Sequence, residues 1–141
     1  AVAIGKLSMT RPTAVLLVAL LCSACAEFAG VFEPDCIAME GDRFVFAGGK
    51  FEWHKFTDER RLDADGNLVD PFPGYPLTGT VVLRGSTVEL TTAAGDRLDD
   101  HFLLERDDDH YLLTREQYAA VTAGGDLPIC ALRRSDEKSP N

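Results

Sequence analysis

The most constraining feature of this sequence is a series of short segments, alternating between apolar and polar residues, that are joined by tight turns. Gly48 and Gly49 separate segments 43–47 and 50–56, and glycine tolerates the positive φ angles that a two-residue hairpin turn requires. The arrangement recurs around Gly85-Ser86, between segments 79–84 and 87–92, and around aspartates 107–109, between segments 98–106 and 110–115. These three hairpins predict an antiparallel β protein.

Each turn fixes the register of its hairpin and thereby assigns side chains to faces. Pairing Ala47 with Lys50, and Arg84 with Thr87, gives each of these hairpins one apolar face. The predicted inward residues are Phe44, Phe46, Phe51 and Trp53 in the first hairpin, Val81, Leu83, Val88 and Leu90 in the second, and Phe102, Leu104, Tyr111 and Leu113 in the third. We expect a core here and, as the alternative, a ligand pocket lined by Phe44, Phe46, Phe51, Trp53, Phe102 and Tyr111.

The remaining elements complete an all-β domain. Thr114 and Gln117 fit a capping box, which predicts a short helix through 118–121. Segments 36–39 and 127–133 are predicted as the first and last strands, and 58–76 as a long irregular connection. About eight strands in meander order predict a small antiparallel barrel or sandwich over residues 36–133, with a disordered tail at 134–141. This layout looks like the lipocalin-type barrels found in bacterial lipoproteins, a resemblance of architecture only.

Residues 11–25 have the character of an export signal. Arg11 precedes an apolar run from 14 to 22, and small residues then lead to Cys25. The run is shorter than the ~20 residues of a membrane-spanning helix and is typical of a helical signal peptide. We therefore expect translation to begin at Met9 and residues 1–24 to be removed.

The sequence CSAC at 22–25 resembles the lipobox of bacterial lipoproteins and departs from it at Cys22, where Leu, Val or Ile is usual. The resemblance implies that lipid is attached to Cys25, that residues 25–35 form a tether, and that this anchor holds the protein on the membrane. Because Ala26 replaces the Asp that some bacteria use as a retention signal, it implies the periplasmic face of the outer membrane. An ordinary cleaved signal peptide without lipid is the alternative.

Charge and cysteines take on a new meaning once the leader is removed. Loss of Lys6 and Arg11 changes the formal charge from −9 to −11, which opposes nucleic-acid binding and favours cationic partners or plain solubility. With Cys22 removed and Cys25 lipidated, Cys36 and Cys130 remain at the two ends of the domain. In a compartment outside the cytoplasm we expect these two to form a disulfide.

Residues with catalytic or metal-binding character form no complete motif. Asp63, Asp65, Asn67 and Asp70 offer alternating oxygen ligands for calcium, but the loop lacks the Gly and Glu that an EF-hand requires at its later positions. His54, His101 and His110 invite a metal interpretation, but His101 and His110 lie four pair-steps apart along the predicted strands, roughly 13 Å, and do not readily share a metal. No nucleophile elbow, zinc-protease motif or phosphate loop is present, so we predict no catalytic residues and no cofactor.

Three functions compete on these observations. The first is a non-catalytic barrel that binds a small apolar ligand or a protein partner, or helps to maintain the envelope. The second is an inhibitor of a cationic host enzyme such as lysozyme, because size, lipobox and β content resemble those of periplasmic lysozyme inhibitors. Their Ser-Gly-x-x-Tyr motif is absent here. The third is a calcium-dependent enzyme or adhesin that uses the loop from Asp63 to Asp70.

Overall fold

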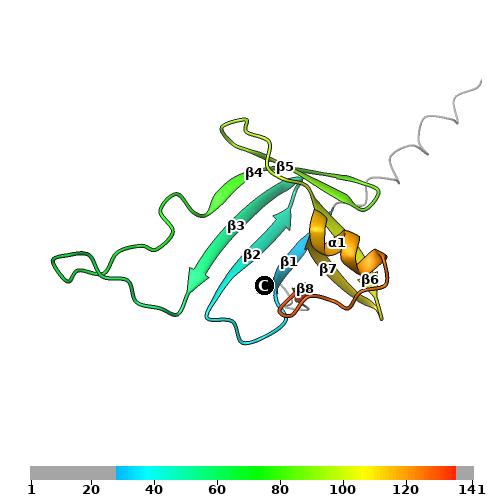
Figure 1. Cartoon of the computed structure of the whole chain (residues 1–141). Helices are drawn as coiled ribbons and strands as arrows, with labels where there is room; N and C mark the ends of the chain where they lie inside the picture. Colours follow the sequence, from blue (N-terminus) through cyan, green and yellow to red (C-terminus); the bar gives the residue numbers. More distant parts are fainter. Residues whose placement is uncertain (1–27, 136–141) are drawn as a thin grey trace, which may run out of the picture.

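The computed structural model describes residues 28–135, which form a closed antiparallel barrel in which the strands follow one another in sequence order (Figure 1). The leader, Met9 and Cys25 lie outside the described residues, as does most of the predicted tail. The elements are β1 (Gly30–Pro34), β2 (Glu40–Ala47), β3 (Lys50–Thr57), β4 (Leu77–Arg84), β5 (Thr87–Thr92), β6 (His101–Arg106), β7 (Asp109–Thr114), α1 (Arg115–Thr122) and β8 (Leu132–Ser135). The predicted all-β barrel with one short helix near the C-terminus is confirmed.

The predicted registers of the first two hairpins are also confirmed. Ala47 pairs with Lys50, and Arg84 pairs with Thr87, as the two-residue turns require. The third hairpin was predicted to turn over residues 107–109; instead Arg106 pairs with Asp109, so the turn contains only Asp107 and Asp108, at φ 53° and 67°. Aspartate is one of the few residues besides glycine that enters this left-handed region readily.

The barrel has two different ends. One end, which we call the turn end, carries the tight turns at 48–49, 85–86 and 107–108. The other, the loop end, carries the long connections at 35–39, 58–76, 93–100 and 115–131, the last of which includes α1 (Figure 1). Because Gly30 pairs with Phe46, and Ser135 with Val31, the chain both enters and leaves the barrel at the turn end.

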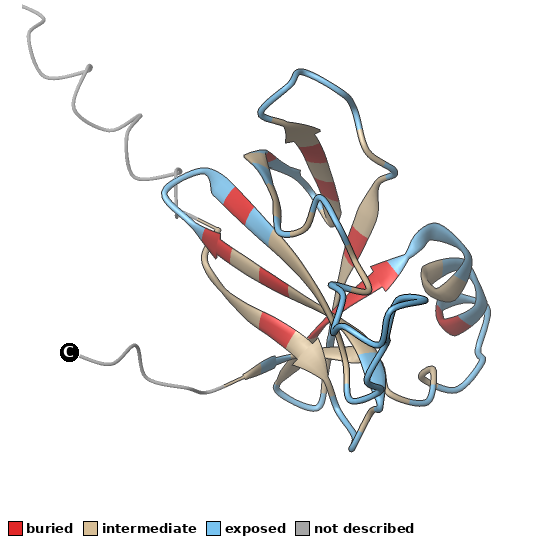
Figure 2. Cartoon of the chain, turned by 90° about the vertical axis from the view of Figure 1, so that its left-hand side faces the viewer, coloured by how far each residue is buried: buried red, intermediate tan, exposed pale blue. Residues whose placement is uncertain are grey.

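The interior of the barrel holds one of two apolar clusters. Its buried members are Phe32, Phe44, Phe46, Phe51, Val81, Val88, Leu90 and Leu112. Most of the predicted inward residues of the first two hairpins are here, and Figure 2 shows buried positions spaced along the strands. Leu83, predicted to face inward, is exposed because it lies beside the turn at the tip of its hairpin.

The second cluster lies outside the barrel, beneath α1, and corrects the prediction for the third hairpin. It contains Tyr111, Leu113, Val121 and Ala131, and the Phe102 ring stacks on Tyr118 of the helix at 4.9 Å. Side chains of a strand alternate between faces, so the opposite face of β7, with Leu112, points into the barrel. Both faces of this strand are apolar, and the pattern alone did not reveal which one the helix covers.

The terminal strands differ from the predicted boundaries. The first strand is β1, inside the segment predicted as a tether, whereas 36–39 is a loop. Phe32 supplies the reason, because its buried ring anchors a strand that pairs with both β2 and β8. At the other end, β8 replaces the predicted strand at 127–133 and takes in the first residues of the predicted tail. Cys130 has φ 58°, which does not fit an extended strand.

The disulfide between Cys36 and Cys130 is present, as predicted, with a Cα–Cα distance of 5.1 Å. It lies next to the seam that closes the barrel, where Pro34 pairs with Leu132 and the Asp35 amide donates to the Ala131 carbonyl at 3.0 Å. The bond therefore joins the 35–39 loop to the 115–131 connection at the loop end. Within residues 28–135, no helix has the length and apolar character needed to cross a membrane.

Candidate functional site

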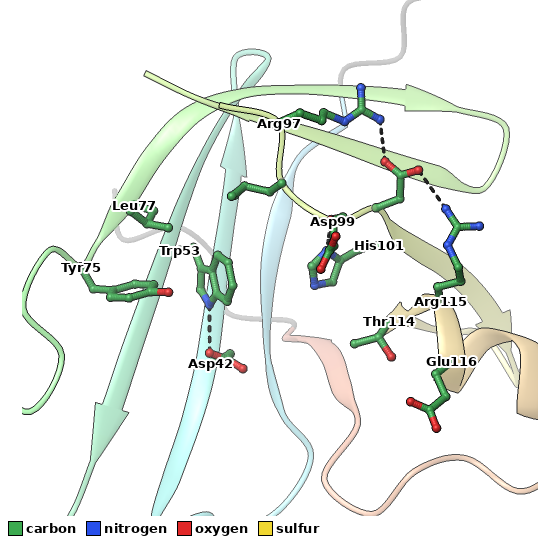
Figure 3. Close-up of a pocket in the computed structure, with 12 residues that line it drawn as sticks. Asp42, Trp53, Tyr75, Leu77, Arg97, Asp99, His101, Thr114, Arg115 and Glu116 are labelled. Carbon is green, nitrogen blue, oxygen red and sulfur yellow. Dashed lines mark hydrogen bonds and ion pairs between the residues drawn. The ribbon is translucent and has the colours of Figure 1, made fainter. Parts of the chain in front are cut away.

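A cavity of about 980 Å³ opens at the loop end of the barrel (Figure 3). We call it the loop-end cleft. Its lining residues are Asp42, Trp53, Tyr75, Leu77, Arg97, Leu98, Asp99, Asp100, His101, Thr114, Arg115 and Glu116. They come from β2, β3, β4, β6, the end of β7, the start of α1 and two of the long connections, so the cleft exists only because the barrel closes.

An aromatic wall forms one side of this cleft. The Trp53 ring stacks on the buried Phe44 at 5.0 Å and meets Tyr75 edge-on at 5.5 Å. The indole Nε1 donates a hydrogen bond of 2.9 Å to the Asp42 carboxylate, which fixes the orientation of the ring (Figure 3). Trp53 therefore joins the core of the barrel to the cleft.

The outer part of this wall already holds an ammonium group. Lys55 Nζ lies 5.4 Å from the centre of the Trp53 ring, 5.5 Å from that of Tyr75 and 3.3 Å from Asp42 Oδ1. It also lies 5.8 Å from the Phe72 ring. Cations are attracted to aromatic faces at these distances, so these contacts hold the 58–76 connection against β3. The wall is therefore chemically suited to positive charge.

A chain of ion pairs lines the opposite side. Asp100 receives hydrogen bonds from Arg97 at 2.6 Å and from Arg115 at 3.1 Å, and Arg97 also lies 3.3 Å from Glu89. The hydrogen bond from Arg97 holds the pKa of Asp100 below its ordinary value. The two arginines are thus neutralised by carboxylates of the protein itself and orient the 93–100 connection.

The charges in the cleft that have no ion-pair partner are negative. The lining carries four carboxylates; Lys55 pairs with Asp42 and the two arginines pair with Asp100, whereas within residues 28–135 neither Asp99 nor Glu116 has an ion-pair partner. A cleft with surplus carboxylates and an aromatic wall attracts cationic groups.

His101 lies between the two sides of the cleft. Its ring is 5.2 Å from Phe44 and 6.3 Å from Trp53, and Nδ1 is 3.2 Å from the Asp99 carbonyl oxygen. Burial lowers the pKa of His101 below its ordinary value, so the ring is neutral near pH 7. Since a carbonyl only accepts, Nδ1 carries the proton and Nε2 is left as an acceptor.

This burial gives a prediction about pH. The unfolded chain binds a proton at His101 with the ordinary pKa of about 6.5, more readily than the folded chain does. We therefore expect the free energy of unfolding to fall as the pH drops below about 6.5, and to fall less in a His101→Gln variant. Urea unfolding at pH 8, 6.5 and 5 measures both proteins. Parallel pH profiles would contradict the assignment.

A smaller cavity of about 230 Å³ adjoins the cleft. It shares Asp42, His101 and Thr114 with the cleft, and Ala38 and Cys130 on its far side bring it to the disulfide. The loop-end cleft and the disulfide-linked loops therefore form one continuous region of the surface.

The structure separates the six rings that were predicted to line one pocket. Phe44, Phe46 and Phe51 are buried in the barrel interior, whereas Phe102 and Tyr111 pack on the helix side. Trp53 lines the loop-end cleft and Phe44 lines the smaller cavity. The six-ring pocket was thus wrong, because the third hairpin presents Phe102 and Tyr111 to α1.

The predicted calcium loop is an exposed turn that satisfies its own polar groups. Asp63 Oδ1 accepts hydrogen bonds of 2.9 Å from the amides of Asp65 and Asn67, and Leu62 bridges to Leu68. Asp70 accepts separately from the Phe72 amide. Hydrogen bonding by the Asn67 amide lowers the pKa of Asp63. In the part of the chain that the structure describes, no three His, Cys, Asp or Glu side chains are grouped so as to hold a metal.

Sequence reasoning missed most residues of the cleft. Asp42 and Tyr75 carry no motif, whereas Trp53 was predicted as a pocket residue, Thr114 only as a helix cap, and His101 was considered only as a metal ligand. No protein-family model, curated protein or solved structure matches this chain. The fold and the cleft define a class of architecture, a small closed antiparallel barrel with a cavity at its loop end.

Proposed function

We propose that this protein is a non-catalytic binding module of the bacterial cell envelope, anchored by lipid on Cys25 to the periplasmic face of the outer membrane. Its binding site is the loop-end cleft, and its ligand carries a cationic group. The observation that carries this proposal is a cavity of about 980 Å³ in which an aromatic wall faces carboxylates that outnumber the arginines.

The direction of the chain supports this arrangement. Gly30 enters the barrel at the turn end, and the segment from Cys25 to Gly30 spans at most about 18 Å when extended. A lipid on Cys25 would therefore hold the turn end near the membrane and leave the loop end facing the aqueous phase. Ligands would then reach the cleft without obstruction from the bilayer.

The contacts within the cleft favour binding over catalysis. Asp42 accepts from Trp53 and pairs with Lys55, and Asp100 is held by two arginines. The hydrogen bond from Arg97 lowers the pKa of Asp100, so this carboxylate is a poor proton acceptor. The negative surplus of the cleft comes from Asp99 and Glu116, and negative charge is a property that a binding site for a cation needs.

The negative surplus also bears on a second candidate function, inhibition of a cationic host enzyme. Such an enzyme would meet the same cleft, and its own lysine or arginine side chains would be the ligand. Size and net charge are compatible with both functions, so the first test uses small molecules, which report on the cleft alone.

Trp53 supplies a direct assay, because the chain contains a single tryptophan. We expect spermidine, a linear triamine, to change the Trp53 fluorescence in a saturable way with a Kd of about 0.1–1 mM at low salt, whereas the dianion glutarate leaves it unchanged. Removing the unpaired charges in an Asp99→Asn/Glu116→Gln variant is expected to weaken spermidine binding about tenfold.

A matched control removes two charges at the opposite end of the barrel. Asp107→Asn/Asp108→Asn changes the net charge by the same amount, and asparagine tolerates the positive φ of this turn. This variant is expected to bind spermidine as the unmodified chain does. Equal weakening in both variants, or no saturable fluorescence change at all, would refute the cleft as a cation-binding site.

A further inference from the structure

Exposed apolar side chains gather at the same end of the barrel as the cleft. In residues 28–135, eight large apolar residues are exposed, and six of them lie on loop-end connections: Ile37, Met39, Leu62, Leu68, Val69 and Ile129. The other two, Val82 and Leu83, lie next to the turn at 85–86. Single exposed apolar residues are ordinary, but several on the connections at one end of a barrel mark a candidate interaction surface.

Three of these residues surround the disulfide, and we call them the apolar collar: Ile37, Met39 and Ile129. Ile37 and Ile129 are fully exposed, at 101% and 96%, and Met39 is 64% exposed. Ile37 follows Cys36 and Ile129 precedes Cys130, so the disulfide ties their two loops together. Holding the loops in place before binding reduces the conformational entropy that a partner must overcome.

The two loops that carry the collar reach the smaller cavity beside the acidic cleft. Ala38 and Cys130, which are sequence neighbours of collar residues, line the smaller cavity, and that cavity shares His101 with the loop-end cleft. A ligand that contacts both regions is larger than a polyamine. It needs apolar groups for the collar and a positive charge for the cleft.

We propose that the loop end is a docking surface for a basic protein, which places a lysine or arginine side chain in the cleft and packs apolar side chains on the collar. This inference rests on the proposed function, because it uses the same cleft. Charge complementarity selects the occupant. The full chain has a formal charge of −9, so the surface draws basic proteins toward it.

Two other possible occupants of this surface, a second copy of the chain and a membrane, fit less well. A second copy would bring two identical acidic clefts face to face, and like charges oppose such an interface. A bilayer would meet the collar only if the loop end faced the membrane, whereas Gly30 and Ser135 leave the barrel at the turn end. The anionic lipids of an envelope membrane would also repel the cleft.

The test is to screen a phage-displayed library of random peptides against the immobilised full chain. We expect enriched peptides to carry lysine or arginine next to large apolar residues and to be displaced by spermidine. Synthetic copies are expected to bind an Ile37→Ser/Ile129→Ser variant at least tenfold more weakly. Both side chains are exposed, so these changes leave the core intact.

The matched control is Val82→Ser/Leu83→Ser, which removes two exposed aliphatic side chains at the turn end. It is expected to bind the peptides normally. The Trp53 titration with spermidine separates the two proposals, since the Ile37→Ser/Ile129→Ser variant should keep its affinity for spermidine. A cleft that binds spermidine while the library yields no enriched peptide would overturn the docking surface and leave the proposed function standing.

Other outcomes also count against the docking surface. Enriched peptides without basic residues would overturn it, as would equal loss of peptide binding in both serine variants. A dimer in analytical ultracentrifugation that the Ile37→Ser/Ile129→Ser change abolishes would assign the collar to a second copy. Slower hydrogen exchange in 35–39 with vesicles of phosphatidylethanolamine and phosphatidylglycerol would assign it to a membrane.

Discussion

Reduction of the Cys36–Cys130 disulfide is expected to lower the free energy of unfolding by roughly 4–5 kcal/mol. The bond closes a loop with a sequence separation of 94, and the chain-entropy model assigns a loop of that size about this stabilisation. The loss is large relative to the ~5–15 kcal/mol of a typical domain. Urea unfolding with and without reductant, followed by far-ultraviolet circular dichroism, measures the difference.

The position of the bond adds a structural reason for this effect. It borders the seam between β1 and β8, where only four residue pairs close the barrel. Without the bond, no covalent link opposes the separation of β1 from β8. In a Cys36→Ala/Cys130→Ala variant the reductant is expected to have no effect. An unchanged urea midpoint on reduction of the unmodified chain would contradict the prediction.

Local turn chemistry explains why the registers of the first two hairpins could be predicted to the residue. A two-residue turn such as Gly48-Gly49 leaves one pairing for its flanking strands, and the alternation of Phe44, Phe46 and Phe51 then fixes which face is buried. These signals lie within about fifteen residues of one another, so no information about distant parts of the chain is needed.

The parts that could not be predicted depend on contacts between distant segments. Tyr111 and Leu112 are adjacent and both buried, one under α1 and one in the barrel, and only the packing of the helix decides between them. β1 contains a glycine and a proline, and its single buried ring, Phe32, gives no alternation to recognise.

The candidate site also depends on contacts between distant segments, because it forms only when the barrel closes. Asp42 and Asp100 come from opposite halves of the domain and meet at one cavity only after eight strands have paired in order. The sequence does indicate where the site lies. Long connections alternate with tight turns along the meander, so all the long connections lie at one end of the barrel. Disulfide, collar and cleft all belong to that end.

Replacement of Phe44 by alanine is expected to lower the free energy of unfolding by about 3–5 kcal/mol. Phe44 is 1% exposed and stacks on Trp53 at 5.0 Å and on Phe46 at 5.9 Å. Deleting its ring leaves a cavity in the middle of this stack, and the closed barrel limits how far its neighbours can move to fill it. The expected loss therefore combines the transfer energy of the ring with the cost of the cavity.

The same substitution tests whether the core supports the cleft. Trp53 loses the ring on which it stacks, so its fluorescence should shift and its affinity for spermidine should fall in the Phe44→Ala variant even under conditions where the protein is fully folded. Urea titration gives the stability, with Val82→Ala as the control, since Val82 is 45% exposed and should cost less than about 0.5 kcal/mol. A loss below 1 kcal/mol at Phe44 would mean that this part of the barrel is loosely packed, and Trp53 would then owe its orientation to the Asp42 hydrogen bond alone.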